Sequence, residues 1–116
     1  MTVKECYEKA GSDYDGVLNR LGSEALIKRF AIKFLNDPSF QDLTDGLAEK
    51  DGEKAFRAAH TLKGICLNLG FSELYKASAE LTEVLREREI PDNVDLYQKV
   101  KEQYEILTAA IQELEA

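Results

Sequence analysis

The stretch GEKAFRAAHTLKGICLNLG, residues 52–70, is the most informative part of this chain and contains its only histidine, His60. Placed at about 100° per residue, its small and aliphatic side chains fall in one contiguous arc. The members of this arc are Ala55, Ala58, Ala59, Leu62, Ile65, Cys66 and Leu69. His60 lies roughly 140–160° from the centre of the arc. The pattern therefore predicts an amphipathic helix with His60 on its solvent side.

The neighbours of His60 on that side are unusual for an exposed surface. Phe56 and Leu67 are large apolar residues beside the histidine rather than in the buried arc. Lys63 follows at i+3, so its ammonium group can reach anything attached to the imidazole. Gly64 follows at i+4, in mid-helix, where glycine costs about 1 kcal/mol relative to alanine. An apolar rim around a reactive, accessible side chain is typical of a docking surface.

Each of these features has a structural explanation as well. A lone histidine is more often a surface bystander than a functional residue, and a glycine can simply let another helix pack closely. Phe56 and Leu67 can also lie under the N-terminal segment as part of a larger core. The combination of four such features on one helical face favours a functional site.

The rest of the chain shows the 3–4 residue spacing of amphipathic helices and no sustained alternation of strands. Ser23 can cap a helix that Pro38 ends, and Gly70 ends the histidine helix. One-sided apolar stripes joined by short loops favour antiparallel packing. We expect an all-α fold, an antiparallel four-helix bundle within one domain that spans 1–116. Its expected helices are 39–50, 53–69, 72–89 and 92–115, with short helices in 1–36, including 23–36, packed on the bundle.

Composition narrows the class of protein. The 116 residues carry a formal charge of −7, whereas nucleic acids and anionic membranes attract basic proteins. No apolar run approaches the roughly 18–20 residues of a membrane-spanning helix, and no signal peptide is visible. We therefore expect a cytoplasmic protein that binds neither nucleic acid nor membrane. Cys6 and Cys66 form no metal-ligand pattern and are expected to be reduced structural thiols.

A family resemblance becomes visible in the histidine helix. The run Ala59-His60-Thr61-Leu62-Lys63-Gly64, followed by Leu69-Gly70, resembles the signature of histidine-containing phosphotransfer (HPt) domains. The spacing of Phe30, Leu35, Phe40 and Leu43, and the Asp51 turn before the histidine helix, are also similar to that family. The resemblance covers about residues 23–89 well and the rest loosely.

The resemblance implies a phosphorelay protein. Such domains accept a phosphoryl group on histidine from a receiver-domain phospho-aspartate, or from a kinase, and pass it to another receiver. His60 would be the acceptor, Lys63 would stabilise the phosphoryl charge, and Gly64 would leave room for the partner. The partners would be response-regulator receiver domains and a hybrid histidine kinase. The Mg²⁺ would belong to the receiver, so no metal or cofactor is expected here, and the family precedent favours a monomer that is not an autonomous enzyme.

One position departs from the family pattern. Many relatives place a glutamate or glutamine on the next helix against the imidazole, and the corresponding residue here is Thr82. Its hydroxyl is shorter and uncharged but can still hydrogen-bond the ring, and phosphorylation directly by a kinase is more in doubt than exchange with receivers. The surface expected to bind partners comprises Phe56, Arg57, Leu67, Ser78 and Arg86.

Three other functions fit the sequence less well. A non-catalytic interaction module could use the same surface, although His60, Lys63 and Gly64 would then be free to vary. A di-iron or haem bundle lacks ligands, since the chain has one histidine and its only methionine is Met1. A hydrolase is disfavoured because no nucleophile elbow, phosphate-binding loop or metal triad is present. The chain begins with methionine and closes with a full helix, so it could stand alone; the donor and acceptor are not encoded in these patterns.

Overall fold

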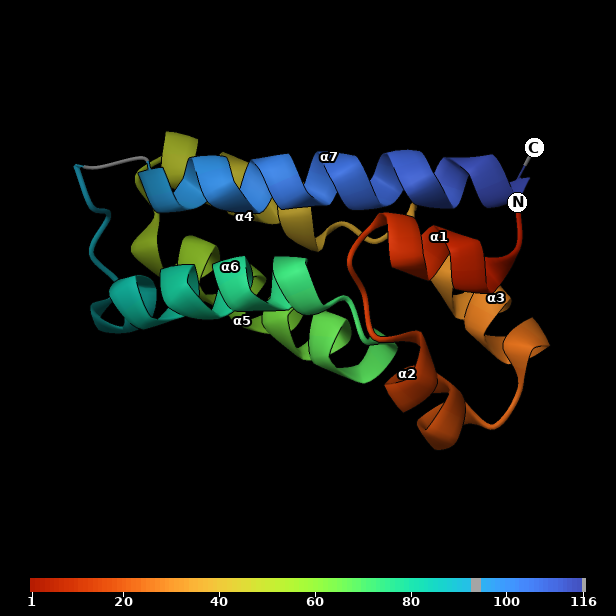
Figure 1. Cartoon of the computed structure of the whole chain (residues 1–116). Coiled ribbons are helices and arrows are strands. Elements are labelled where there is room, and N and C mark those ends of the chain that lie inside the picture. The colour runs from red at the N-terminus through yellow and green to blue at the C-terminus, as the bar shows by residue number, and fades with distance from the viewer. Residues whose placement is uncertain (93–94, 116) are drawn as a thin grey trace.

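Figure 1 shows the fold as a computed structural model, which describes residues 1–92 and 95–115. These residues form helices and connecting turns and contain no strand, which confirms the predicted all-α class. The helices are α1 (Val3–Lys9), α2 (Tyr14–Leu21), α3 (Glu24–Phe34), α4 (Ser39–Ala48), α5 (Gly52–Leu69), α6 (Ser72–Val84), the 3₁₀ helix η1 (Leu85–Glu87) and α7 (Asp95–Glu115).

The helix ends follow from local side-chain chemistry. The Ser23 hydroxyl accepts the Leu26 N–H at 3.0 Å and so caps α3, as the sequence predicts. The Asp51 carboxylate accepts the Lys54 N–H at 3.1 Å at the start of α5. Gly70 ends α5 in the left-handed conformation, at φ 72°. The histidine helix is therefore bounded by a cap at each end.

The end of α6 differs from the expected range of 72–89. The helix stops at Val84 and tightens into η1, and Arg88 then adopts a left-handed backbone at φ 61°. The Arg88 N–H donates to the Leu85 carbonyl at 2.8 Å, which closes the turn. A left-handed residue cannot continue a right-handed helix, and here an arginine occupies the position that glycine usually marks.

The last helix begins at Asp95 in the structure, whereas the sequence suggested a start at 92. Residues 93–94 and the expected domain end at 116 lie outside the described residues. Neither α7 nor any other helix in the described ranges is long and apolar enough to cross a membrane.

From α4 to α7, each α-helix packs against the next α-helix along the chain. Helix α5 packs against α4 and α6, and α6 packs against α7, which runs alongside it in the opposite direction (Figure 1). Aromatic side chains join α7 back to α4, because the Phe40 ring stacks on Tyr104 at 4.1 Å between centroids and on Tyr97 at 6.0 Å. The Thr44 and Tyr97 hydroxyls are hydrogen-bonded at 2.8 Å.

Helices α4 and α5 approach each other closely at a glycine. A Cβ atom added at Gly46 would lie 2.7 Å from the backbone nitrogen of Ala55 and 3.0 Å from its Cα. Both distances are far below van der Waals contact, so only glycine fits at this position. The contact sets how α4 lies on the helix that carries His60.

The N-terminal helices gather at one end of the molecule. Helix α1 packs against α7, α2 and α3, and α3 also packs against α5 (Figure 1). Lys9 and Glu113 form an ion pair at 3.0 Å between α1 and α7. The N–H of Asp13 donates to the Gly70 carbonyl at 2.8 Å, so the loop after α1 is joined to the turn after α5.

The same segment satisfies the last carbonyl groups of the histidine helix. The buried Tyr7 hydroxyl donates to the Leu69 carbonyl at 2.7 Å. The Arg20 guanidinium donates to the carbonyls of Leu67 and Asn68, each at 3.1 Å. The final carbonyls of a helix have no partner within the helix, and positive charge is favourable there. The N-terminal segment therefore forms a clamp, comprising Tyr7 and Arg20, on the C-terminal end of α5.

Alanine substitution at two mid-helix glycines tests the α4–α5 contact. Gly46→Ala is expected to lower the free energy of unfolding by about 1–3 kcal/mol, because its methyl group meets the Ala55 backbone. Gly64→Ala is the matched control: its Cβ would meet no atom within 4 Å, so helix propensity alone should raise stability by up to about 1 kcal/mol. Urea denaturation measures both. Equal effects in the two variants would contradict this packing.

Removing one hydroxyl group tests the clamp. Tyr7→Phe is expected to lower the free energy of unfolding by about 0.5–1.5 kcal/mol, because the Leu69 carbonyl loses its donor. Tyr14→Phe is the control, since its hydroxyl makes no hydrogen bond within the described part of the chain and its ring packs against Tyr7 at 5.9 Å. Amide hydrogen exchange in the last turn of α5 should accelerate in Tyr7→Phe alone. Unchanged exchange in that variant would show that the clamp does not hold this turn.

Candidate functional site

Helix α5 presents His60 to solvent. The residues Ala55, Ala58, Ala59, Leu62 and Cys66 are buried on its opposite face, as the helical spacing predicts, and Ile65 and Leu69 are partly buried. The imidazole of His60 is exposed, and within the described residues it makes no hydrogen bond. Both ring nitrogens are therefore open to a reacting group, and neutral imidazole is a competent nucleophile near neutral pH.

Space is left open one turn beyond the imidazole. A Cβ added at Gly64 would meet no atom within 4 Å, so this glycine does not serve close packing against another helix. Because glycine has no side chain, nothing protrudes from the helix surface at this position beside His60. Lys63 is half-buried, and no ion pair involves it among the described residues. Its ammonium is therefore free to attract an anion bound near His60.

Apolar surface continues along α5 past the glycine. Leu67 is 56% exposed, the largest exposed fraction of any large apolar side chain among the described residues. Beside it, helices α2, α3 and α5 border a groove of about 370 Å³. Its lining residues are Arg20, Leu21, Phe30, Ile65, Asn68 and Leu69. The explanation that Leu67 lies beneath the N-terminal segment is therefore wrong, and Leu67 is available to a partner.

Phe56 belongs to a more enclosed arrangement. It is partly buried, and its ring lies nearly parallel to the His60 imidazole, at 15° and 5.8 Å between centroids. The guanidinium carbon of Arg88 lies 3.8 Å from the centre of the same ring. Sequence reasoning missed Arg88, because the left-handed turn that brings it back to α5 carries no glycine to signal it.

Two residues of α6 lie elsewhere than their expected roles require. Thr82 is fully buried, and its hydroxyl donates to the Ser78 carbonyl at 2.7 Å. Ser78 is 1% exposed, so it lies in the interior and not on a surface where a partner could dock. The helical spacing predicted that both residues flank the buried stripe of α6, whereas the structure buries both of them. No hydrogen bond joins Thr82 to His60 in the described structure.

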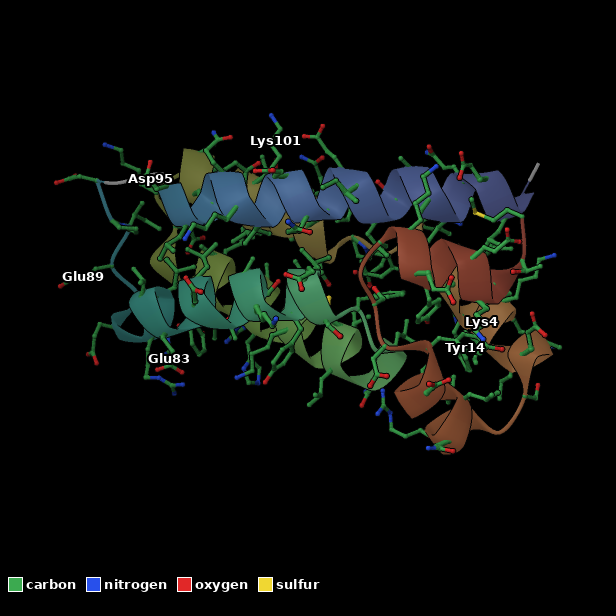
Figure 2. The ribbon with its side chains drawn as sticks, in the orientation of Figure 1. Lys4, Tyr14, Glu83, Glu89, Asp95 and Lys101 are labelled. Atoms are coloured by element: carbon green, nitrogen blue, oxygen red, sulfur yellow. The ribbon has the colours of Figure 1, made fainter. Side chains whose placement is uncertain are left out.

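The two expected partner-binding arginines are exposed but already paired. Arg57 donates to Glu53 at 2.8 Å, one turn before it on α5. Arg86 forms an ion pair with Glu83 at 2.6 Å, and Glu83 projects from α6 on the side turned away from α7 (Figure 2). The hydrogen bond from Arg86, and the more distant charge of Lys63, hold the pKa of Glu83 below its ordinary value.

The charge around His60 is opposite to that of the chain as a whole. Residues 54–72 contain Lys54, Arg57 and Lys63 and no aspartate or glutamate, although the formal charge of the protein is −7. Beyond Glu53, the side chains of α5 that carry charge are therefore all basic, and Lys63 is the one of the three that has no ion pair within the described residues. Such a strip favours an anionic ligand or an acidic protein surface at His60.

The cysteines provide no second reactive centre. Both thiols are buried and free. Burial raises the pKa of Cys6 to about 11 and raises that of Cys66 further, so neither is a thiolate near neutral pH. Within residues 1–92 and 95–115 no three His, Cys, Asp or Glu side chains are grouped to hold a metal ion.

Comparison with known proteins identifies a family for most of the chain. A family model described as the Hpt domain matches residues 36–116, well over half of the chain. Searches of curated proteins and of solved structures returned no match. The matched region contains the whole of α5 with His60, Lys63 and Gly64, whereas the N-terminal clamp lies outside it. The chain belongs to the Hpt domain family, and this membership implies a part in the histidine phosphotransfer of a phosphorelay.

Proposed function

We propose that this protein is a phosphorelay intermediate that accepts a phosphoryl group on His60 and passes it to another protein. The donor is the phospho-aspartate of a receiver domain or a histidine kinase, and the acceptor is the aspartate of a second receiver. The observation that carries the proposal is an exposed imidazole, free of hydrogen bonds, beside the open space at Gly64. A ring buried beneath other side chains could not meet a phosphoryl group held in another protein.

The transfer step needs little chemistry from this chain. A nitrogen of the neutral imidazole attacks phosphorus, the bond from phosphorus to the aspartate oxygen breaks, and the carboxylate leaves with the electron pair. The reverse sequence with a second receiver regenerates His60. Phosphoryl transfer depends mainly on positioning and on neutralising charge at the three equatorial oxygens. Lys63 supplies positive charge from this side, and the Mg²⁺ is held by the receiver, so this chain acts as an intermediate rather than an autonomous enzyme.

The partner surface extends along the exposed side of α5. Leu67 and the groove beside it offer apolar contact, while Arg57 and Lys63 offer positive charge to the acidic surroundings of a phospho-aspartate. Arg57 and Arg86 can give up their ion pairs with Glu53 and Glu83 and pair with carboxylates of a receiver domain instead. Little free energy is lost in this exchange, because an exposed ion pair contributes at most about 1 kcal/mol to stability. Phe56 belongs to this surface because its partly buried ring lies beside the His60 imidazole.

The helices α4, α5, α6 and α7 are best described as an antiparallel four-helix bundle to which α1, α2 and α3 are added as part of one domain. The packing of α5 on α4 and α6, of α6 on α7, and of Phe40 on Tyr104 supports this arrangement. We further propose that the protein works as a monomer in the cytoplasm, without a cofactor of its own.

Replacement of the histidine tests the chemistry directly. His60→Gln is expected to keep the fold, because the side chain is exposed, and to abolish acceptance of phosphate. The measurement is acid-labile phosphate on this chain after incubation with phosphorylated receiver domains and Mg²⁺. Retained binding of a receiver by both proteins, without label on either, would instead support a non-catalytic interaction module.

A second substitution tests the role of the open space. Gly64→Gln should slow transfer by at least about tenfold while leaving His60 in place, because a side chain one turn away obstructs the partner; tenfold corresponds to about 1.4 kcal/mol. Gly64→Ala is the matched control and should be much less impaired. The rate of label transfer, measured beside the urea midpoint of each variant, separates obstruction from unfolding. A Gly64→Gln variant that transfers at the wild-type rate would contradict this role.

A further inference from the structure

His60 is connected through Phe56 to a charged cluster at the other end of the exposed helix face. The Phe56 ring lies nearly parallel to the imidazole, and the Arg88 guanidinium carbon lies 3.8 Å from the centre of that ring. A guanidinium group at this distance attracts the electron-rich face of an aromatic ring. Arg88, Phe56 and His60 therefore form a continuous series of contacts, here named the stack.

The backbone of Arg88 is fixed against the start of α5. A Cβ atom at Gly52 would lie only 1.6 Å from the Arg88 carbonyl oxygen, so the two backbones are in direct contact. Arg88 itself adopts the left-handed conformation, which is costly for a residue other than glycine. Surrounding structure must hold a residue in such a conformation, and an observed outlier of this kind is a reason to look for a function.

The side chain of Arg88 is held as well. Its Nε donates to one carboxylate oxygen of Glu53 at 3.1 Å, and a terminal nitrogen donates to the Arg86 carbonyl. The other oxygen of Glu53 accepts from Arg57 at 2.8 Å. Hydrogen bonds from Arg88 and then Arg57 keep the pKa of Glu53 below its ordinary value, so this carboxylate stays ionised over the range in which proteins function. Glu53 thus holds Arg88 in place over Phe56.

We propose that Arg88 is a positioning residue for phosphoryl transfer: through the stack it holds the Phe56 ring against which the His60 imidazole packs. This inference rests on the proposed function of His60. An exposed histidine otherwise moves among several rotamers. A ring that packs beside the imidazole limits that freedom and keeps a nitrogen directed toward the partner's phosphorus, and such orientation contributes to rate.

The expected effect is moderate. Cation–aromatic contacts at exposed sites have strengths that correspond to a change of about two- to fivefold in rate. Arg88→Gln and Phe56→Leu should each slow the maximal rate of single-turnover transfer from a phosphorylated receiver domain by about this factor. Lys101→Gln, which removes a positive charge from the exposed side of α7, is the control and should leave the rate unchanged, since Lys101 belongs neither to α5 nor to the stack.

A double-mutant cycle distinguishes the stack from independent effects. If Arg88 acts through Phe56, Arg88→Gln should have no further effect on rate in a Phe56→Leu protein. Equal slowing in both backgrounds would overturn the proposal. So would a change only in the receiver concentration that gives half-maximal rate, because that result would make Arg88 a docking residue.

A second readout does not depend on phosphorylation. The ring protons of His60 should shift in the NMR spectrum of both Arg88→Gln and Phe56→Leu, because the position of the imidazole beside an aromatic ring changes. Lys101→Gln should leave them in place. If the wild-type protein accepts no phosphate, the proposed function fails while these shifts still test the stack. Unchanged His60 signals in Arg88→Gln would overturn the stack even where transfer occurs.

Discussion

The rotation of α5 about its own axis is the constraint on which the rest of the structure depends. A helix has one angular setting that buries Ala55, Ala59 and Leu62 and leaves His60 in solvent. Backbone contacts fix that setting near the start of the helix, where Gly46 meets Ala55 and Gly52 meets Arg88. Tyr7 and Arg20 fix it at the other end through the last carbonyl groups. Protein interiors are close-packed and deform little. The contacts that fix the rotation of α5 in the core therefore also fix the direction in which His60 points.

The site combines an open side with a supported side. Toward Gly64 and Leu67 the surface of α5 is accessible, and nothing within the described residues covers the imidazole. Toward Phe56 the helix is braced by the turn after η1 and by the ion pairs of Glu53. Thr82 makes no hydrogen bond to the imidazole in the described structure, and its hydroxyl donates to the Ser78 carbonyl. The family position that often carries a longer polar side chain is here part of the packed interior, and support for the imidazole comes from an aromatic ring.

The sequence predicted the features of the fold and site for which a residue type or spacing has a single structural interpretation. Helical periodicity predicted the buried and exposed faces of α5, and Ser23 and Gly70 marked helix ends. The positions of Ser78 and Thr82 could not be fixed in the same way. A helical wheel does not say how far a neighbouring helix covers its flank. Thr82 can be buried because its hydroxyl donates to the carbonyl one turn earlier, whereas the buried Ser78 hydroxyl has no hydrogen-bond partner in the described structure. The role of Arg88 could not be predicted for a different reason. Its contact with Phe56 depends on a left-handed backbone conformation that arginine rarely adopts.

The uneven distribution of charge has a consequence for how partners arrive. A protein of formal charge −7 repels an acidic macromolecule from most directions, but the acid-free stretch 54–72 is an exception on the exposed side of α5. Over distances of about a Debye length, roughly 8 Å at physiological ionic strength, such a field rotates an approaching acidic protein before contact. Collisions are thereby biased toward the orientation in which His60 is met first. Electrostatic steering of this kind raises the association rate, which suits the proposed exchange of a phosphoryl group between successive partners.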